Sequence, residues 1–206
     1  MKNSSDKSSP AGAAEIIERE IVHDGFSRFE RVKVRQRRRD GREQVVNREF
    51  QHRGDAVAVL PYDPSRRTGI LVRQLRVPLL ARQDGTEFLV EVPAGHLERG
   101  EDAALTARRE AEEEAGLILQ DLDHVLDVFP SPGMNTEKLS LFLGRYGVHH
   151  RTSGGGGLPH EGEDIEVLEW PLARIADALR AGEITDAKTV ILVQALMLKK
   201  PELFRP

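Results

Sequence analysis

The sequence predicts an α+β fold built around a mixed sheet. Strand-like segments precede and follow one central helix, and further helices end the chain. Strands and helices do not alternate regularly, which disfavours a doubly wound parallel sheet. The length of 206 residues, 39% of them hydrophobic, suits one globular domain with a small additional sub-domain.

The N-terminal quarter of the chain is charged and favours strands. Residues 1–14 are rich in Ser, Lys and Ala and are expected to be a disordered tail. Asp40-Gly41 predicts a hairpin turn. A sheet this polar has little core of its own, so we expect residues 15–53 to pack on the main domain or on a second subunit. The expected strands cover residues 16–24, 26–36 and 43–51.

The main domain is expected to cover residues 54–206. Gly116 and Gly182 follow two helical segments, where a helix commonly ends, and Asp186 is a candidate N-cap of the last helix. The Gly-rich residues 153–157 predict a flexible loop. Helices are expected over residues 102–115, 171–182 and 186–200. Apolar strands are expected over residues 55–63, 68–77, 88–94, 123–133, 138–146 and 164–170.

Composition excludes several classes of function. The chain has no cysteine, so thiolate zinc sites, disulfide frameworks and cysteine nucleophiles are ruled out. A net charge of -4 disfavours a general nucleic-acid binder. No apolar run approaches the roughly 20 residues of a membrane span. These features fit a protein of the reducing cytoplasm without nucleic-acid or membrane partners.

Three glutamates share one face of the helix expected over residues 102–115. Glu110, Glu113 and Glu114 lie at offsets of zero, three and four, whereas Glu112 points away. Like charges at this spacing repel each other, and a divalent cation would remove that cost. Carboxylates without His or Cys suit Mg²⁺, or alternatively Mn²⁺. The competing interpretation is a solvated helix face.

Residues around these glutamates suit the same site. Gly95 lets the chain turn sharply after a strand and lets the carbonyl of Ala94 approach an ion. Glu101, one loop upstream, can support the cluster from outside. Arg109 can pair with Glu113 across one helical turn.

The complete spacing resembles the Nudix box: Gly, five residues, Glu, seven residues, Arg-Glu, two residues, Glu-Glu, one residue, Gly. Leu117 supplies the hydrophobic residue that follows, and Ala111 occupies the other hydrophobic position. The matching residues are Gly95, Glu101, Arg109, Glu110, Glu113, Glu114 and Gly116.

This resemblance implies an α/β/α sandwich around a mixed sheet, with the box as a loop–helix–loop. It also implies hydrolysis of a nucleoside diphosphate linked to another moiety, with water attacking phosphorus near bound metal. The implied catalytic residues are Glu113, Arg109 and, as general base, Glu161 on an acidic loop of residues 160–164. The implied metal ligands are Ala94, Glu110, Glu113, Glu114 and Glu163.

Stretches outside the box resemble the ADP-ribose and GDP-mannose pyrophosphatase branch of that family. They include residues 46–63, the segment VRQLRVP, the turn SPGMNTEKL, the acidic loop and strand of residues 160–172 and the C-terminal residues 182–196. Met134 replaces a second Gly usual in the turn. The implied substrate contacts are Arg48, Arg76, Phe26, Pro132 and Gly133. The arginines suit a diphosphate because a guanidinium meets phosphate oxygens bidentately. Their alternative is an ordinary surface position.

Relatives in this branch exchange N-terminal strands between two subunits, so the resemblance also implies a homodimer. The expected reaction is Mg²⁺-dependent hydrolysis of ADP-ribose to AMP and ribose 5-phosphate. GDP-mannose or another nucleotide sugar is the alternative substrate, toward which the C-terminal stretch leans. A non-catalytic module that senses ADP-ribose is the remaining alternative, disfavoured because no box glutamate is lost.

Overall fold

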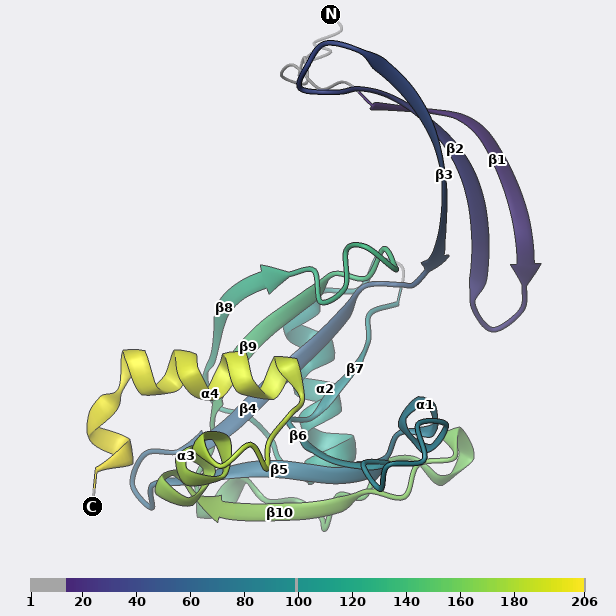
Figure 1. Ribbon diagram of the computed structural model, residues 1–206. Coiled ribbons are helices and arrows are strands. Elements are labelled where there is room, and N and C mark those ends of the chain that lie inside the picture. Colours follow the sequence, from purple (N-terminus) through teal and green to yellow (C-terminus); the bar gives the residue numbers. More distant parts are fainter. Residues whose placement is uncertain (1–13, 99, 206) are drawn as a thin grey trace, which may run out of the picture. The chain divides into compact units, whose positions relative to one another are not determined.

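The computed structural model describes residues 14–98 and 100–205. The chain divides into two compact units, coloured along the sequence in Figure 1. The first unit holds the described residues up to Arg53 together with Ser131–Glu137. The second unit holds Gly54–Pro130 and the chain from Lys138 onward. The tail expected over residues 1–14 lies outside the described residues, except for Ala14.

The first unit is an antiparallel sheet of three strands in the order β1-β2-β3. The turn between β2 and β3 contains Gly41, whose φ of 82° suits the hairpin predicted there. Val32 is one of its few buried apolar residues, so charged pairs across the strands and hydrogen bonds hold much of this sheet together. The strands are β1 (Ala14–Asp24), β2 (Arg28–Arg37) and β3 (Glu43–His52).

The second unit contains a seven-stranded mixed sheet, with β4 and β9 parallel and the other pairings antiparallel. Its main path runs β10-β5-β4-β9-β8, while β6 pairs with β5 and β7 pairs with β4. This confirms the predicted α+β class. The strands are β4 (Ala56–Asp63), β5 (Thr68–Leu75), β6 (Phe88–Glu91), β7 (Ala94–His96), β8 (Leu122–Val128), β9 (Leu139–Arg145) and β10 (Glu166–Pro171).

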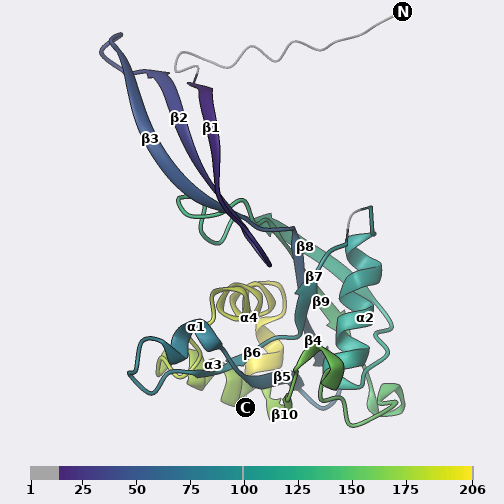
Figure 2. The ribbon, with the colours of Figure 1, turned by 90° about the vertical axis from the view of Figure 1, so that its right-hand side faces the viewer.

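Alternate side chains of β4 enter different cores, because successive residues of a strand point to opposite faces. Ala58 and Leu60 pack with the residues of α3 (Leu172–Arg180) and α4 (Ala187–Lys199). Val57 and Val59 pack with α2 (Ala103–Ala115). Figure 2 shows α2 on one side of the sheet and α4 on the other, which is the predicted α/β/α sandwich. Full burial of each such aliphatic side chain contributes about 1.5–3 kcal/mol.

The helix that carries the glutamates begins and ends where the sequence predicts. The side chain of Asp102 accepts hydrogen bonds from the backbone N–H groups of Ala104 and Leu105 at 2.9 and 3.1 Å. Gly116 closes α2 in the left-handed conformation, with a φ of 67°. Asp186 caps α4 by accepting from the N–H of Thr189 at 2.9 Å. The end of α2 at Gly116 and the start of α4 at Asp186 are therefore confirmed.

Three segments differ from the expected strands. The strand expected over residues 123–133 ends at Val128, and a turn follows it. The strand expected over residues 88–94 is two strands, because Val92 donates its N–H to the Thr189 hydroxyl and Pro93 has no N–H. After Leu75 the chain forms the short helix α1 (Val77–Leu80), with Pro78 in its first turn. Short 3-10 turns cover Val148–His150, Pro159–Glu161 and Pro201–Phe204. No helix within the described residues is long and apolar enough to span a bilayer.

Candidate metal site

Two glutamates of α2 are buried one helical turn apart on the face turned toward the sheet. Glu110 and Glu114 are only 7% and 2% exposed to solvent. The strand β7 lies against them, because the N–H of Ala94 donates to Glu114 Oε2 at 3.0 Å. A Cβ added at Gly95 would overlap the Glu110 carboxyl group. A side chain at this position would push the Glu110 carboxyl group away from the backbone of β7.

Arg109 joins the remaining glutamate of the helix to this pair. Its Nη1 donates to Glu113 Oε2 at 2.8 Å, the pairing that the sequence predicts. Its Nη2 lies 2.8 Å from Glu110 Oε1. Glu113 is thus connected to the buried pair through a guanidinium, and its side chain remains 27% exposed.

The environment of Glu114 disfavours a lone charge. The pKa of Glu114 is raised to about 8, chiefly by burial and also by the neighbouring charges of Glu110 and Glu163. The N–H of Ala94 and the charge of Arg76 oppose this shift of the pKa only in part. A divalent cation beside these oxygens would reverse the balance by favouring the carboxylate.

The carboxylate oxygens of Glu110 and Glu114 are the kind of ligand that a hard cation prefers, but two side chains are too few to complete its coordination. Within the described part of the chain, no three acidic, imidazole or thiol side chains lie close enough together to hold an ion. The two buried carboxylates would need a backbone oxygen, a water molecule or a further carboxylate to complete six-fold oxygen coordination. The Ala94 carbonyl and Glu163 are the sequence-predicted candidates for these additions.

The acidic loop approaches the C-terminal end of α2 through its Gly-rich segment. The N–H groups of Gly156 and Gly157 donate to the carbonyls of Glu114 and Glu113 at 3.0 and 3.1 Å. Glu163 Oε2 in turn accepts from the N–H of Leu158 at 2.9 Å. Glu161 ends a 3-10 turn, and its side chain lies outside what the structure describes. The segment that the sequence predicts to be a flexible loop, residues 153–157, is therefore hydrogen-bonded to α2 in the structure.

Glu101 contacts the start of the helix. Its carboxylate accepts from the N–H of Glu98 and from the Thr106 hydroxyl, both at 3.0 Å. These hydrogen bonds, led by the one from Glu98, lower the pKa of Glu101. Glu101 therefore ties the loop before α2 to the helix, and its support of the glutamate cluster stays a prediction.

Arg76 belongs to a buried ionic cluster that the sequence reasoning did not identify. Its Nε and Nη2 donate to Glu91 at 2.6 and 2.9 Å, and Lys188 of α4 also donates to Glu91. Burial alone would raise the pKa of Glu91, but Arg76 and Lys188 hold it below its usual value. The sequence does contain a signal for this cluster, which is the glutamate inside the apolar stretch FLVEVPA. A charged residue in a buried strand needs a partner of opposite charge, so this glutamate indicates a buried ion pair.

The other predicted substrate residues lie in the first unit. Arg48, on β3, donates to the carbonyl of its neighbour Asn47 at 2.8 Å. Phe26 follows β1 and is 95% exposed. Pro132 and Gly133 form a turn closed by the N–H of Met134 donating to the carbonyl of Ser131 at 2.9 Å. The roles of these four residues in substrate binding stay predictions.

Comparison with known proteins agrees with this arrangement. Residues 52–192 match the family profile described as NUDIX domain. The GDP-mannose pyrophosphatase of Salmonella arizonae is 35% identical over 181 residues, which cover 88% of this chain and 93% of the relative. That of Cronobacter sakazakii is 34% identical over 90% of this chain and 95% of the relative. A crystal structure described as an ADP compounds hydrolase superposes with a TM-score of 0.71, with 22% identity over 94% of this chain and 97% of that chain.

Proposed function

The chain belongs to the NUDIX domain family and is a hydrolase of the nucleotide-sugar diphosphatase type, and we propose that its substrate is GDP-mannose. The observation that carries the proposed chemistry is the buried pair Glu110 and Glu114 against the backbone of Ala94. The choice of sugar nucleotide is supported by relatives at 34–35% identity that bear the name GDP-mannose pyrophosphatase.

ADP-ribose is the second candidate substrate, and it is the one that the sequence alone placed first. The turn at Ser131-Pro132-Gly133 resembles the one in both ADP-ribose and GDP-mannose hydrolases, so it is compatible with either substrate. Both substrates present the same diphosphate to the box and differ in the base and the sugar. The groups outside the box would therefore decide between them.

Enzymes of this family need divalent metal ions, and we propose Mg²⁺ here, with Mn²⁺ as substitute. Glu110, Glu113, Glu114, Glu163 and the Ala94 carbonyl would hold it, which requires the carboxylates to move closer together than the structure places them. The bound cation would neutralise charge that develops on the diphosphate oxygens. Arg109 would keep the carboxylates of Glu110 and Glu113 in place through the contacts described above.

The general base is proposed to be Glu161. It would take a proton from the water that attacks one phosphorus, while the phosphorus–oxygen bond to the other phosphate breaks. Hydrolysis of GDP-mannose in this way gives GMP and mannose 1-phosphate. Arg76 and Arg48 would bind the diphosphate and sugar through their guanidinium groups, and Phe26 would stack on the base.

The proposed assembly is a homodimer in which the N-terminal strands of one subunit complete the site of the other. The strands β1 to β3 leave large apolar side chains exposed, among them Ile21, Val22 and Phe29 at 53%, 50% and 42%. Large apolar side chains that a single subunit leaves exposed are available for contact with a second subunit. An isologous dimer would cover both copies at once.

A substrate panel tests the proposed function. The purified chain is incubated with GDP-mannose, ADP-ribose, ADP-glucose, NADH and diadenosine polyphosphates, each with Mg²⁺ or Mn²⁺, and products are identified by mass. GMP and mannose 1-phosphate as the fastest products support the proposal. AMP and ribose 5-phosphate alone would transfer the assignment to ADP-ribose. Binding of a nucleotide sugar without turnover would favour the non-catalytic module.

A further inference from the structure

The carboxylate of Glu91 is the most buried charged group of the second unit, with 1% of its surface exposed. It lies at the end of β6, three residues before Ala94. An isolated charge at such a place is strongly destabilising unless paired cations and hydrogen bonds compensate it. Arg76 and Lys188 supply that compensation, and the site retains a charged carboxylate close to the box.

The geometry at Arg76 leaves part of its guanidinium for another ligand. Glu91 engages Nε at 2.6 Å and Nη2 at 2.9 Å, so it occupies one edge of the planar group. A guanidinium carries five N–H donors in a rigid plane, so the edge formed by Nη1 and the second Nη2 proton is turned away from Glu91. The side chain remains 37% exposed. Its charge is also close enough to oppose the raised pKa of Glu114.

Lys188 fixes the other side of Glu91. Its ammonium donates to Glu91 and to Asp186 Oδ1, the latter at 2.8 Å, and its side chain is 12% exposed. Asp186 is also the N-cap of α4, so the cluster joins that helix to β6. Two carboxylates thus face two cations, and loss of the Glu91 charge would leave Arg76 without its fixed partner.

We propose that Glu91 is a positioning residue of the hydrolase: it orients Arg76 so that the free edge of the guanidinium meets the substrate diphosphate beside the carboxylates of α2. This inference rests on the proposed function, because it needs a diphosphate substrate that contacts Arg76. A merely structural cluster would hold α4 to the sheet and would leave substrate affinity unchanged when Arg76 is otherwise intact.

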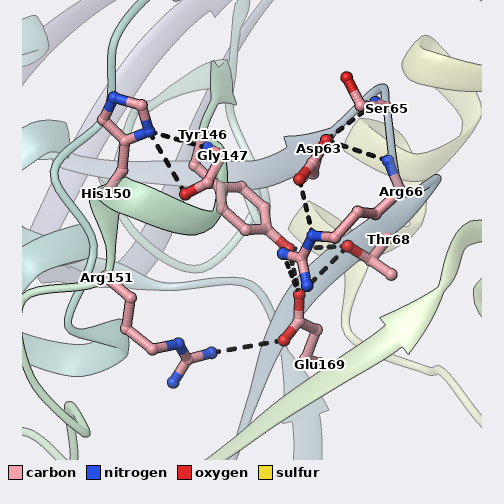
Figure 3. A network of polar contacts seen from close by, with 9 residues as sticks. All are labelled: Asp63, Ser65, Arg66, Thr68, Tyr146, Gly147, His150, Arg151 and Glu169. Carbon is pink, nitrogen blue, oxygen red and sulfur yellow. Dashed lines mark hydrogen bonds and ion pairs between the residues drawn. The ribbon is translucent and has the colours of Figure 1, made fainter.

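A second buried carboxylate provides a matched control at the opposite end of β5. Asp63 Oδ2 accepts from Arg66 Nε at 2.8 Å, and the two side chains are 4% and 39% exposed, close to the values of the Glu91–Arg76 pair. Figure 3 shows that this network continues through Arg66 to Glu169 and Tyr146. Replacing Asp63 by Asn therefore reproduces the loss of a buried Arg partner away from Arg76.

The test compares Glu91→Gln with Asp63→Asn in steady-state hydrolysis of GDP-mannose and ADP-ribose, with thermal unfolding measured beside it. Both variants are expected to lose thermal stability. Glu91→Gln is expected to raise KM about tenfold with kcat changed less than about twofold, since a uniform binding contact is weakened. Asp63→Asn is expected to keep the wild-type KM. The Mg²⁺ concentration for half-maximal activity should stay unchanged in both.

A double variant separates positioning from structural support. If Glu91 acts through Arg76, Glu91→Gln combined with Arg76→Ala will have the same KM as Arg76→Ala alone. A double variant whose KM rises by the product of the two single-variant factors, or a wild-type KM in Glu91→Gln, would overturn the inference. Should Glu91→Gln fail to fold, Glu91→Asp keeps the charge but reaches less far, and the same two outcomes apply to it. Absence of nucleotide-sugar hydrolysis by the wild-type chain would instead refute the proposed function.

Discussion

At the scale of single residues, the glutamates of the box differ in how deeply their side chains are buried. Glu110 and Glu114 are buried against β7, whereas Glu113 is held by Arg109 at the rim. The spacing in the sequence places all three on one face of a helix, but it does not say which of them the sheet covers. That distinction comes from packing against β7, where Gly95 lies against the Glu110 carboxyl group and the N–H of Ala94 donates to Glu114.

The raised pKa of Glu114 predicts how stability depends on pH. In the folded chain the pKa is about 8, against a usual value of 4.5, so the folded state keeps a proton that the unfolded state has released. Without metal, the free energy of unfolding should therefore fall as pH rises from about 4.5 to about 8. Mg²⁺ binds the deprotonated carboxylate, so its stabilising effect should grow over the same window.

Differential scanning calorimetry at pH 6 and pH 8, with EDTA or with Mg²⁺, checks this prediction. Glu114→Gln should remove both the pH-dependent loss of Tm and most of the stabilisation by Mg²⁺. Glu112→Gln, on the exposed side of the same helix, should retain both. A metal-free Tm that stays constant between pH 6 and pH 8 would contradict the assignment to Glu114.

Glu161 can be distinguished from Glu163 by two replacements. If Glu161 is the general base, Glu161→Gln should lower kcat by about 10²–10⁴-fold, the usual contribution of a positioned base. Its half-activating Mg²⁺ concentration should change little. Glu163→Gln should raise that concentration, because Glu163 is the proposed ligand. Near-normal turnover of Glu161→Gln at saturating Mg²⁺ would assign the base to another residue.

At the scale of elements, the Gly-rich segment of residues 153–157 connects the acidic loop to α2. The last carbonyls of a helix have no partner within it, and here Gly156 and Gly157 supply two of the missing donors. Gly155 has a φ of 68°, and a Cβ there would overlap the Glu114 carbonyl. Glycine is therefore needed at this position for close contact as well as for backbone conformation.

Three alanine substitutions measure the importance of this contact. Gly155→Ala should lower Tm and raise the half-activating Mg²⁺ concentration several-fold, because the loop bearing Glu163 would be displaced from α2. Gly182→Ala places a methyl group in open space at a φ of 73°, so it should show only the strain of about 1–2 kcal/mol. Gly154→Ala, in open space at an ordinary φ, should resemble the wild type. Equal Mg²⁺ requirements in all three variants would show that the contact does not affect the site.

Local signals predict most elements of this fold, and non-local pairing explains the remainder. Gly116 and Asp186 mark helix ends that the structure confirms. The division of the expected strand at Val92 depends on Thr189, which lies 97 residues away in the sequence. The pairing of Glu91 with Lys188 spans the same separation, and no periodicity in the sequence reveals it.

At the scale of the whole molecule, the box was predictable because its residues follow one another at a fixed spacing in α2 and just before it. The fold around the box was predictable from the family resemblance that this spacing carries. The substrate half of the site was less predictable. Arg76 and the glutamates of α2 belong to the second unit, whereas Arg48 and Phe26 belong to the first. Whether residues of the first unit act in the same subunit or in a partner depends on assembly, which a single sequence does not encode locally.

Complementation between two inactive variants tests the proposed exchange of strands. Arg48→Ala impairs the first unit and Glu114→Gln impairs the second, and each variant alone should have low activity. In a mixed dimer with exchange, one site combines an intact first unit with an intact second unit from the other subunit. Random mixing during co-expression makes half of the dimers mixed, so activity should return to about one quarter of the wild-type value.

The outcome without exchange is different, because each site would then carry one of the two defects. Co-expressed chains would have no more activity than the average of the separate variants, and the exchanged dimer would be rejected. Light scattering on the same samples confirms that dimers are present. Arg48→Ala must itself be impaired for the test to support exchange, and wild-type activity in that variant would remove Arg48 from the proposed site.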